Sequence, residues 1–254
     1  MALNISGGPT SCDKQVDLSI ILDASDGMEP IWNDVLQFLV QFLEYYAIGS
    51  NGTQVSLVSF GREATIEFAF GRYTRRSNLN DAINGLQLIG GERNTQDGLR
   101  KMRIVYSSGY GDRLGVPDEA ILITNGPHSP DTIDPIREAS RAFSDRINVL
   151  TVGIGQVDET EIQEMAKEPQ EEGRDYWVVE SVDDLSDILY RLQVMSCESA
   201  VNKCTLGEHS YGNVEEVKMN MFSSRLRHIS FGSWIRSGHI WIDPRQRRRK
   251  LGIN

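Results

Sequence analysis

The sequence predicts a doubly wound α/β fold, in which a mostly parallel sheet carries helices on both faces. Short runs rich in β-branched residues alternate along the chain with segments whose apolar residues recur at helical spacing. Several of these short runs are apolar at consecutive positions, which is typical of strands that are buried on both faces. The length of 254 residues suits one sizeable domain with an appendage.

Each element follows from its local pattern. Strands are expected over the apolar runs at residues 16–22, 54–60, 120–124, 147–154 and 176–179, with 64–70 as a hairpin partner. Helices are expected over the periodic segments at residues 31–46, 79–86, 99–105, 132–144 and 159–167. A final helix is expected after the capping-box pattern at residues 181–184. Loops at 23–28, 90–95 and 125–131 then lie where such sheets hold their sites, at the carboxyl ends of strands.

Charge and hydropathy exclude two classes of protein. The net charge is −10 with a pI near 5.0, so the chain as a whole does not bind nucleic acid electrostatically. No apolar run approaches the roughly 18 residues of a membrane helix. Residues 205–254 nevertheless hold nine Lys or Arg against four Asp or Glu, which indicates an acidic body with a basic tail.

The cysteines and sequons bear on the compartment. Cys12 precedes the first predicted strand and Cys197 follows the last helix, with Cys204 left over. A bridge closing a loop this long stabilises by about 4–5 kcal/mol in the chain-entropy model, whereas the alternative is three free thiols. Sequons at Asn4 and Asn51 favour secretion. No signal peptide is visible at the N-terminus, so we expect either a fragment of a longer product or an intracellular protein.

Catalytic motifs are weak or missing. Gly153 and Gly155 lack the third glycine of a dinucleotide site, and there is no phosphate-binding loop motif. His128 is the only histidine before residue 205, and no serine in a nucleophile-elbow motif is near it. We therefore expect a protein that is not an enzyme, with a solvated His128.

Three segments in the right order carry a family resemblance. DLSIILDASDG at 17–27, GGERNTQDGL at 90–99 and AILITNGPHSPD at 120–131 resemble the landmark segments of a von Willebrand factor type A domain. The placement of Cys12 and Cys197 resembles that in the secreted members of matrilins and collagens. The resemblance implies a disulfide between these two cysteines. It also implies an N-terminal segment over 1–11, the domain over 12–197, and a linker with a basic, partly disordered tail over 198–254.

In that family, the three loops hold Mg²⁺ or Mn²⁺ at a metal-ion-dependent adhesion site. Hard oxygen ligands come from a D-x-S-x-S loop, a threonine and an aspartate. This sequence matches the pattern at Asp23 and Ser25 and departs from it at Gly27, Arg93 and Asn125. The resemblance therefore implies a degenerate site.

A guanidinium beside a divalent ion is repelled by roughly 4 kcal/mol per unit of ionic charge at 4 Å and an effective dielectric of about 20. Our hypothesis is that Arg93 takes the place of the metal and neutralises Asp23, so that no cofactor is needed. An alternative is that Asp23 and Ser25 only cap the first helix.

The expected function is a non-enzymatic, secreted interaction and adhesion module that binds an extracellular matrix protein such as a collagen, largely without metal. Two alternatives stay open: a metal-dependent adhesion receptor fragment that uses Asp23 and Ser25, and an intracellular scaffold. The residues expected on the ligand face are Asp26, Arg93, Asn94, Thr95, Asn125 and His128.

Overall fold

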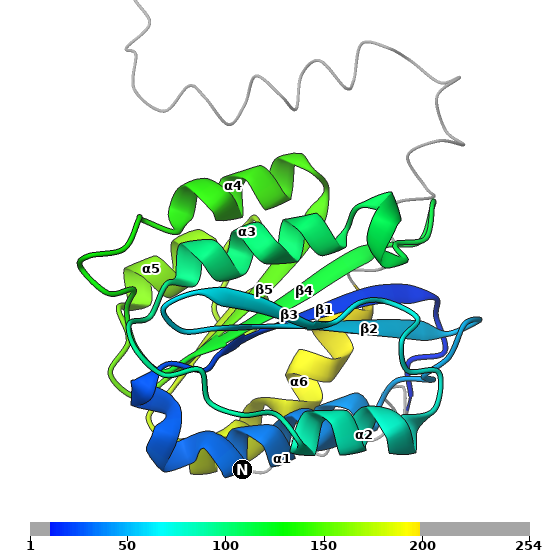
Figure 1. The fold of residues 1–254 in the computed structure, drawn as a ribbon, viewed down its shortest axis with the longest axis horizontal. Helices are drawn as coiled ribbons and strands as arrows, with labels where there is room; N and C mark the ends of the chain where they lie inside the picture. The colour runs from blue at the N-terminus through cyan, green and yellow to red at the C-terminus, as the bar shows by residue number, and fades with distance from the viewer. Residues whose placement is uncertain (1–10, 199–254) are drawn as a thin grey trace, which may run out of the picture. The chain divides into compact units, whose positions relative to one another are not determined.

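The computed structural model describes residues 11–198. A six-stranded sheet with the order β3-β2-β1-β4-β5-β6 forms its centre (Figure 1). All neighbouring strands are parallel except β2 and β3, which form the antiparallel hairpin that the sequence predicts. The predictions for Asn4 and for residues 205–254 lie outside the described residues.

The elements follow the predicted order closely. The strands are β1 (Val16–Asp23), β2 (Thr53–Phe60), β3 (Ala64–Phe68), β4 (Asp118–Thr124), β5 (Ile147–Ile154) and β6 (Tyr176–Val179). The α-helices are α1 (Trp32–Leu43), α2 (Arg76–Asn84), α3 (Thr95–Val105), α4 (Ile136–Ser144), α5 (Glu159–Met165) and α6 (Leu185–Glu198). Short 3-10 helices are η1 (Asp26–Ile31), η2 (Ser108–Tyr110) and η3 (Val182–Asp184).

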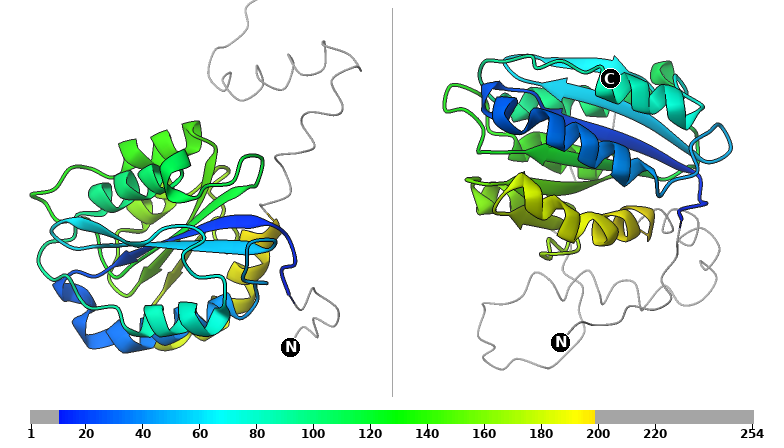
Figure 2. Two further views of the ribbon diagram at one scale, coloured as in Figure 1. Left: turned by 45° about the vertical axis from the view of Figure 1, so that its right-hand side comes forward. Right: turned by 90° about the horizontal axis from the view of Figure 1, so that it is seen from below.

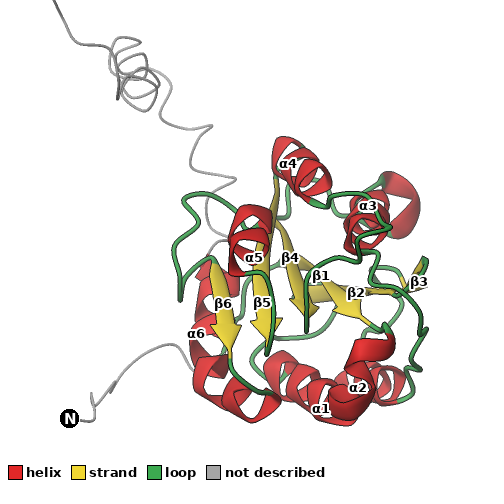
Figure 3. Ribbon diagram, turned by 90° about the vertical axis from the view of Figure 1, so that its left-hand side faces the viewer, coloured by secondary structure: helices red, strands yellow, loops and turns green. Residues whose placement is uncertain are grey.

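Helices cover both faces of the sheet, so the predicted doubly wound α/β class is confirmed. Helices α1, α2 and α6 lie on one face, and α3, α4 and α5 lie on the other (Figures 1 and 3). The central strand β1 is buried along its whole length because it has neighbours on both edges and a helical layer on each side. Its alternate residues supply the two cores, as shown by Leu22 on the α1 side and Ile21 on the α3 side.

Helix α4 is shorter than predicted. The apolar period indicates a helix from residue 132, but α4 begins at Ile136, after Pro135 at the N-cap position. Asp134 accepts a hydrogen bond from the backbone N–H of Ile136 and so caps the helix from outside. Among the described residues, no helix is long and apolar enough to span a bilayer.

A disulfide joins the two ends of the described unit. Cys12 and Cys197 are linked across a sequence separation of 185 residues, and both side chains are buried. The segment before β1 and the end of α6 therefore lie side by side (Figure 2). The bridge closes almost the entire domain into one loop, which is the condition under which a cross-link restricts the unfolded chain most.

Removing this bridge should destabilise the domain strongly. We expect the double substitution Cys12→Ala with Cys197→Ala to lower the free energy of unfolding by about 4–5 kcal/mol, because the unfolded chain regains loop entropy. Urea denaturation of the variant and of the parent, each with and without reductant, measures this. A parent that loses no stability on reduction would contradict the expectation.

Candidate interaction site at the carboxyl end of the sheet

Three loops meet at the carboxyl ends of the central strands. Strand β1 ends at Asp23 and its neighbour β4 ends at Thr124, while the loop before α3 brings Arg93 to the same edge. Strand β1 stands where the strand order reverses, between β2 and β4. This is the position at which open α/β sheets place their binding sites.

The guanidinium of Arg93 lies in the middle of the three loops. Its Nε donates to Oδ2 of Asp23 at 2.5 Å, and its Nη2 donates to Oδ1 of Asn125 at 2.5 Å. Its Nη1 donates to the carbonyl of Pro127 at 3.0 Å. The backbone is held as well, because Arg93 N–H donates to Oγ of Ser129 and Ser129 N–H donates to the Arg93 carbonyl. Arg93 is thus an ordered link between all three loops.

Asp23 is the buried anion that this cation faces. Its side chain is fully buried, whereas that of Arg93 is 14% exposed. The hydroxyl of Thr124 donates to Oδ2 at 2.8 Å, and the backbone N–H of Ser25 donates to Oδ1 at 2.9 Å. Charge-assisted hydrogen bonds of this kind are about twice as strong as neutral ones. The carboxylate is therefore satisfied entirely by groups of the protein.

Two glycines make room for the guanidinium. A Cβ atom built on Gly27 would lie 2.5 Å from Nη2 of Arg93, and one built on Gly126 would lie 2.5 Å from Nη1. Asn125 bridges the loops as well, since its Nδ2 donates to the carbonyl of Gly27 at 2.5 Å. Gly27, which stands at the second serine position of the family motif, thus packs together with Arg93 and Asn125.

The donor set fits a divalent cation poorly. Mg²⁺ and Mn²⁺ need several oxygen ligands and at least one or two carboxylates in octahedral geometry. Among the five described residues at the family's ligand positions, only Asp23 carries a carboxylate, and Arg93 already binds it. The hydroxyl of Ser25 is buried and has no hydrogen-bond partner among the described residues, so it does not cap the first helix as the alternative interpretation proposed.

The other residues expected on the ligand face have different roles. Asp26 is exposed and accepts a hydrogen bond from Gly91 N–H at 2.8 Å, which ties the first loop to the second. Asn94 caps α3 by accepting from Asp97 N–H. The prediction for Thr95 is wrong, because it is the first residue of α3 and its side chain is fully buried.

His128 is not the solvated residue that the sequence predicts. Its Nδ1 lies 2.5 Å from Oε2 of Glu161, and its backbone N–H donates to Oε1 of the same carboxylate. The side chain is 27% exposed. The pair fixes the loop after β4 onto α5, and only the fold brings these two residues together across 33 positions of sequence.

A second arginine–aspartate pair lies at the amino end of the same strand. The carboxylates of Asp17, Asp112 and Asp118 lie within 4.8 Å of one another, a grouping that sequence analysis did not find. Arg113 binds Asp17 through both its backbone N–H and its Nε, each at 2.8 Å. Burial raises the pKa of Asp17 above its usual range, and Arg113 opposes this shift.

Comparison with known proteins identifies similar sequences. A model of the von Willebrand factor type A domain family matches residues 17–191. Matrilin-1 of Mus musculus is 26% identical over 202 residues, covering 77% of this chain and 39% of that protein. Matrilin-4 of Homo sapiens is 32% identical over 163 residues, covering 61% and 25%. The collagen alpha-6(VI) chain of Mus musculus is 25% identical over 232 residues, covering 90% of this chain and 9% of that one.

Solved structures show the same fold. Proximal thread matrix protein 1 from the mussel byssus aligns with a TM-score of 0.68 at 21% identity, covering 74% of this chain and 49% of that one. The form of that protein with a zinc-occupied adhesion motif gives 0.66 at 22% identity, covering 74% and 47%. Manganese-loaded Plasmodium vivax TRAP protein gives 0.57 at 16% identity, covering 70% and 73%.

Removal of the Arg93 guanidinium should destabilise the domain, because the charge of Asp23 is buried. We expect Arg93→Met to lower the free energy of unfolding by about 3–5 kcal/mol, because it leaves a buried charge without its partner. Adding Asp23→Asn should restore most of this loss. Chemical denaturation of the single and double variants measures both effects.

Arg100→Met is the matched control, since Arg100 pairs with Asp97 on the surface and is 45% exposed. Its cost should stay below about 1 kcal/mol. Equal losses for Arg93→Met and Arg100→Met would show that the guanidinium of Arg93 does not neutralise Asp23.

Proposed function

The chain belongs to the von Willebrand factor type A family, and from this premise we propose that it is an extracellular, non-enzymatic interaction module. In this proposal it binds a matrix protein such as a collagen through the loop face around Arg93, without a metal ion. The observation that carries the proposal is the bond from Arg93 Nε to Asp23 Oδ2 at 2.5 Å. It gives the buried carboxylate its counter-charge from within the protein.

The relatives support the class of partner. Matrilins and collagen chains are among the proteins to which this chain is similar over most of its length. The matched region spans 39% of matrilin-1 and 9% of the collagen alpha-6(VI) chain, so it corresponds to a module within those proteins. This similarity to matrix proteins supports a matrix protein as the partner.

Two structural features support an extracellular location. The Cys12–Cys197 disulfide is of the kind that persists in oxidising compartments. Asn51 of the second sequon lies on an exposed turn before β2, where a glycan meets no obstacle from the core. Both features agree with secretion of the protein that contains this domain.

The loop face offers shape and hydrogen-bonding groups for recognition. Asp26 and Pro127 are exposed, and Ile133 on the loop after β4 is 68% exposed. An apolar side chain held out on a polar, well-braced loop is typical of an interface anchor. We therefore place the partner over this face, in contact with the loop after β4.

One observation favours a second candidate function, the metal-dependent adhesion receptor fragment. The hydroxyl of Ser25 is buried and has no hydrogen-bond partner in the described part of the chain, and it stands at a position that provides a metal ligand in the family. With Arg93 turned outward, Asp23 and Ser25 would be the residues to hold the ion. The two candidates differ in whether binding needs a cation.

A binding assay with chelator separates the two. We expect the protein to bind an immobilised matrix protein equally well with and without EDTA, because Arg93 fulfils the role of the ion. Ile133→Ser should weaken binding by about tenfold, the effect of removing one buried aliphatic anchor. Surface plasmon resonance over a panel of matrix proteins measures both.

Leu114→Ser is the control for that assay. Leu114 is fully exposed and precedes β4, so it lies near the amino ends of the parallel strands, whereas the loop face lies at their carboxyl ends. The substitution should leave binding unchanged. Binding that disappears with EDTA would instead support the metal-dependent candidate, and equal effects of the two serine variants would remove the loop face from the proposal.

Restoring the family pattern should create a metal site. We expect the triple substitution Gly27→Ser, Arg93→Thr and Asn125→Asp to bind Mn²⁺ saturably at about micromolar affinity, since it adds two hydroxyls and a carboxylate to Asp23 and Ser25. Isothermal titration calorimetry of the triple variant and of the parent measures this. Adding Asp23→Ala should abolish the signal, and saturable binding by the parent would contradict the proposed role of Arg93.

A further inference from the structure

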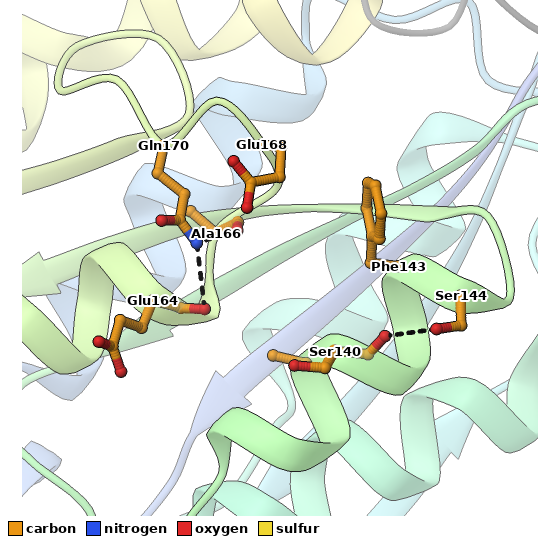
Figure 4. Close-up of a pocket in the computed structure, with 8 residues that line it drawn as sticks. Ser140, Phe143, Ser144, Glu164, Ala166, Glu168 and Gln170 are labelled. Atoms are coloured by element: carbon orange, nitrogen blue, oxygen red, sulfur yellow. Dashed lines mark hydrogen bonds between the residues drawn. The ribbon is translucent and has the colours of Figure 1, made fainter. Parts of the chain in front are cut away.

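A groove distant from the loop face lies between α4 and the segment that follows α5 (Figure 4). It has a volume of about 260 Å³. Its lining comprises Ala139, Ser140, Phe143, Ser144, Glu164, Ala166, Glu168 and Gln170. No part of the proposed matrix-binding site contributes to it.

The groove forms because two alanines leave space beside the larger side chain of Phe143. Ala139 and Ala166 are buried, and their short side chains leave space between the helix and the loop. Phe143, one turn after Ala139 on α4, stands beside this space with its ring 55% exposed. An aromatic ring left half in water offers both apolar area and a negative π face.

A carboxylate stands across the gap from this ring. Glu168 is exposed, and Figure 4 shows its side chain on the loop that faces α4. Within residues 11–198, neither Glu168 nor Glu164 forms an ion pair, although Lys167 precedes Glu168 in the sequence and Arg141 follows the lining residue Ser140. Arg141 binds Glu138, and Lys167 lies 3.7 Å from Asp175.

The loop that carries Glu168 is held in place. The side chain of Gln170 donates to the carbonyls of Glu164 and Ala166 at the end of α5. In return, Gln163 donates to the Gln170 carbonyl at 3.3 Å. The backbone of this loop is therefore largely preformed, which lowers the entropic cost of binding.

The segment that carries Glu168 is acidic, unlike the helix across the groove. Residues 136–146, which contain α4, hold three Arg against one Glu and one Asp. Residues 158–175, which contain α5 and the loop after it, hold eight Asp or Glu against two Lys or Arg, a net charge of −6. Such a local excess raises the concentration of cationic partners near the groove.

From these observations we infer that the groove docks an arginine- or lysine-containing peptide segment of a partner protein. One cationic side chain enters between the ring of Phe143 and the carboxylate of Glu168, where it makes a cation–π contact and an ion pair. Neighbouring cations of the same segment interact with the acidic surface of α5 and the loop after it. This site is separate from the proposed matrix-binding face and does not depend on it.

The test uses the full chain and a fluorescein-labelled peptide of alternating glycine and arginine, measured by fluorescence anisotropy at low ionic strength. We expect saturable binding that weakens with added salt. Phe143→Ala and Glu168→Gln should each raise Kd by about two- to fivefold, the effect of one exposed cation–π contact or ion pair. Phe143→Leu, which keeps apolar area but removes the π face, should act like Phe143→Ala.

Two controls keep the inference falsifiable. Glu44→Gln removes one exposed carboxylate at the end of α1, on the other face of the sheet, and should leave Kd unchanged. A peptide with citrulline in place of arginine should not bind. Absence of saturable binding, equal effects of Glu44→Gln and Glu168→Gln, or binding of the citrulline peptide would each overturn the inference. Because Arg93 and Ile133 take no part, failure here leaves the proposed function unaffected.

Discussion

An aspartate that is wholly buried at the end of a central strand needs a positive charge beside it. Asp23 occupies this position because β1 has strands on both edges and helices on both faces. In the family, a divalent ion bound by several loops normally supplies the charge. In this chain, a guanidinium bound to the loops after β1 and β4 supplies it, and its bonds fix the relative positions of the loops around it.

The departures from the family pattern are best understood as one change. Arg93 needs space, and the glycines at 27 and 126 are the positions where even a Cβ atom would collide with it. It also needs a neutral acceptor, which Asn125 provides through Oδ1 while its amide nitrogen holds the carbonyl of Gly27. An aspartate at position 125 would place two carboxylates against one guanidinium. The substitutions are therefore interdependent.

Sequence reasoning predicted the order and type of the elements because each strand and helix has a clear local pattern. It placed Arg93 beside Asp23 because the family motif supplied the register. It missed contacts that arise only from folding, such as His128 with Glu161 and the grouping of Asp17, Asp112 and Asp118. The burial of Thr95 was missed because a loop position in the motif became the first residue of a helix, facing inward.

Replacing an ion by a side chain changes what the loop face can recognise. A bound dication keeps a coordination position open for an anionic group of the partner, and it leaves when the medium is depleted of metal. A guanidinium cannot leave, and its charge is already balanced by Asp23, so little net attraction remains for an external carboxylate. In the proposed function, recognition at this face therefore depends on the shape of the braced loops and on neutral or apolar contacts.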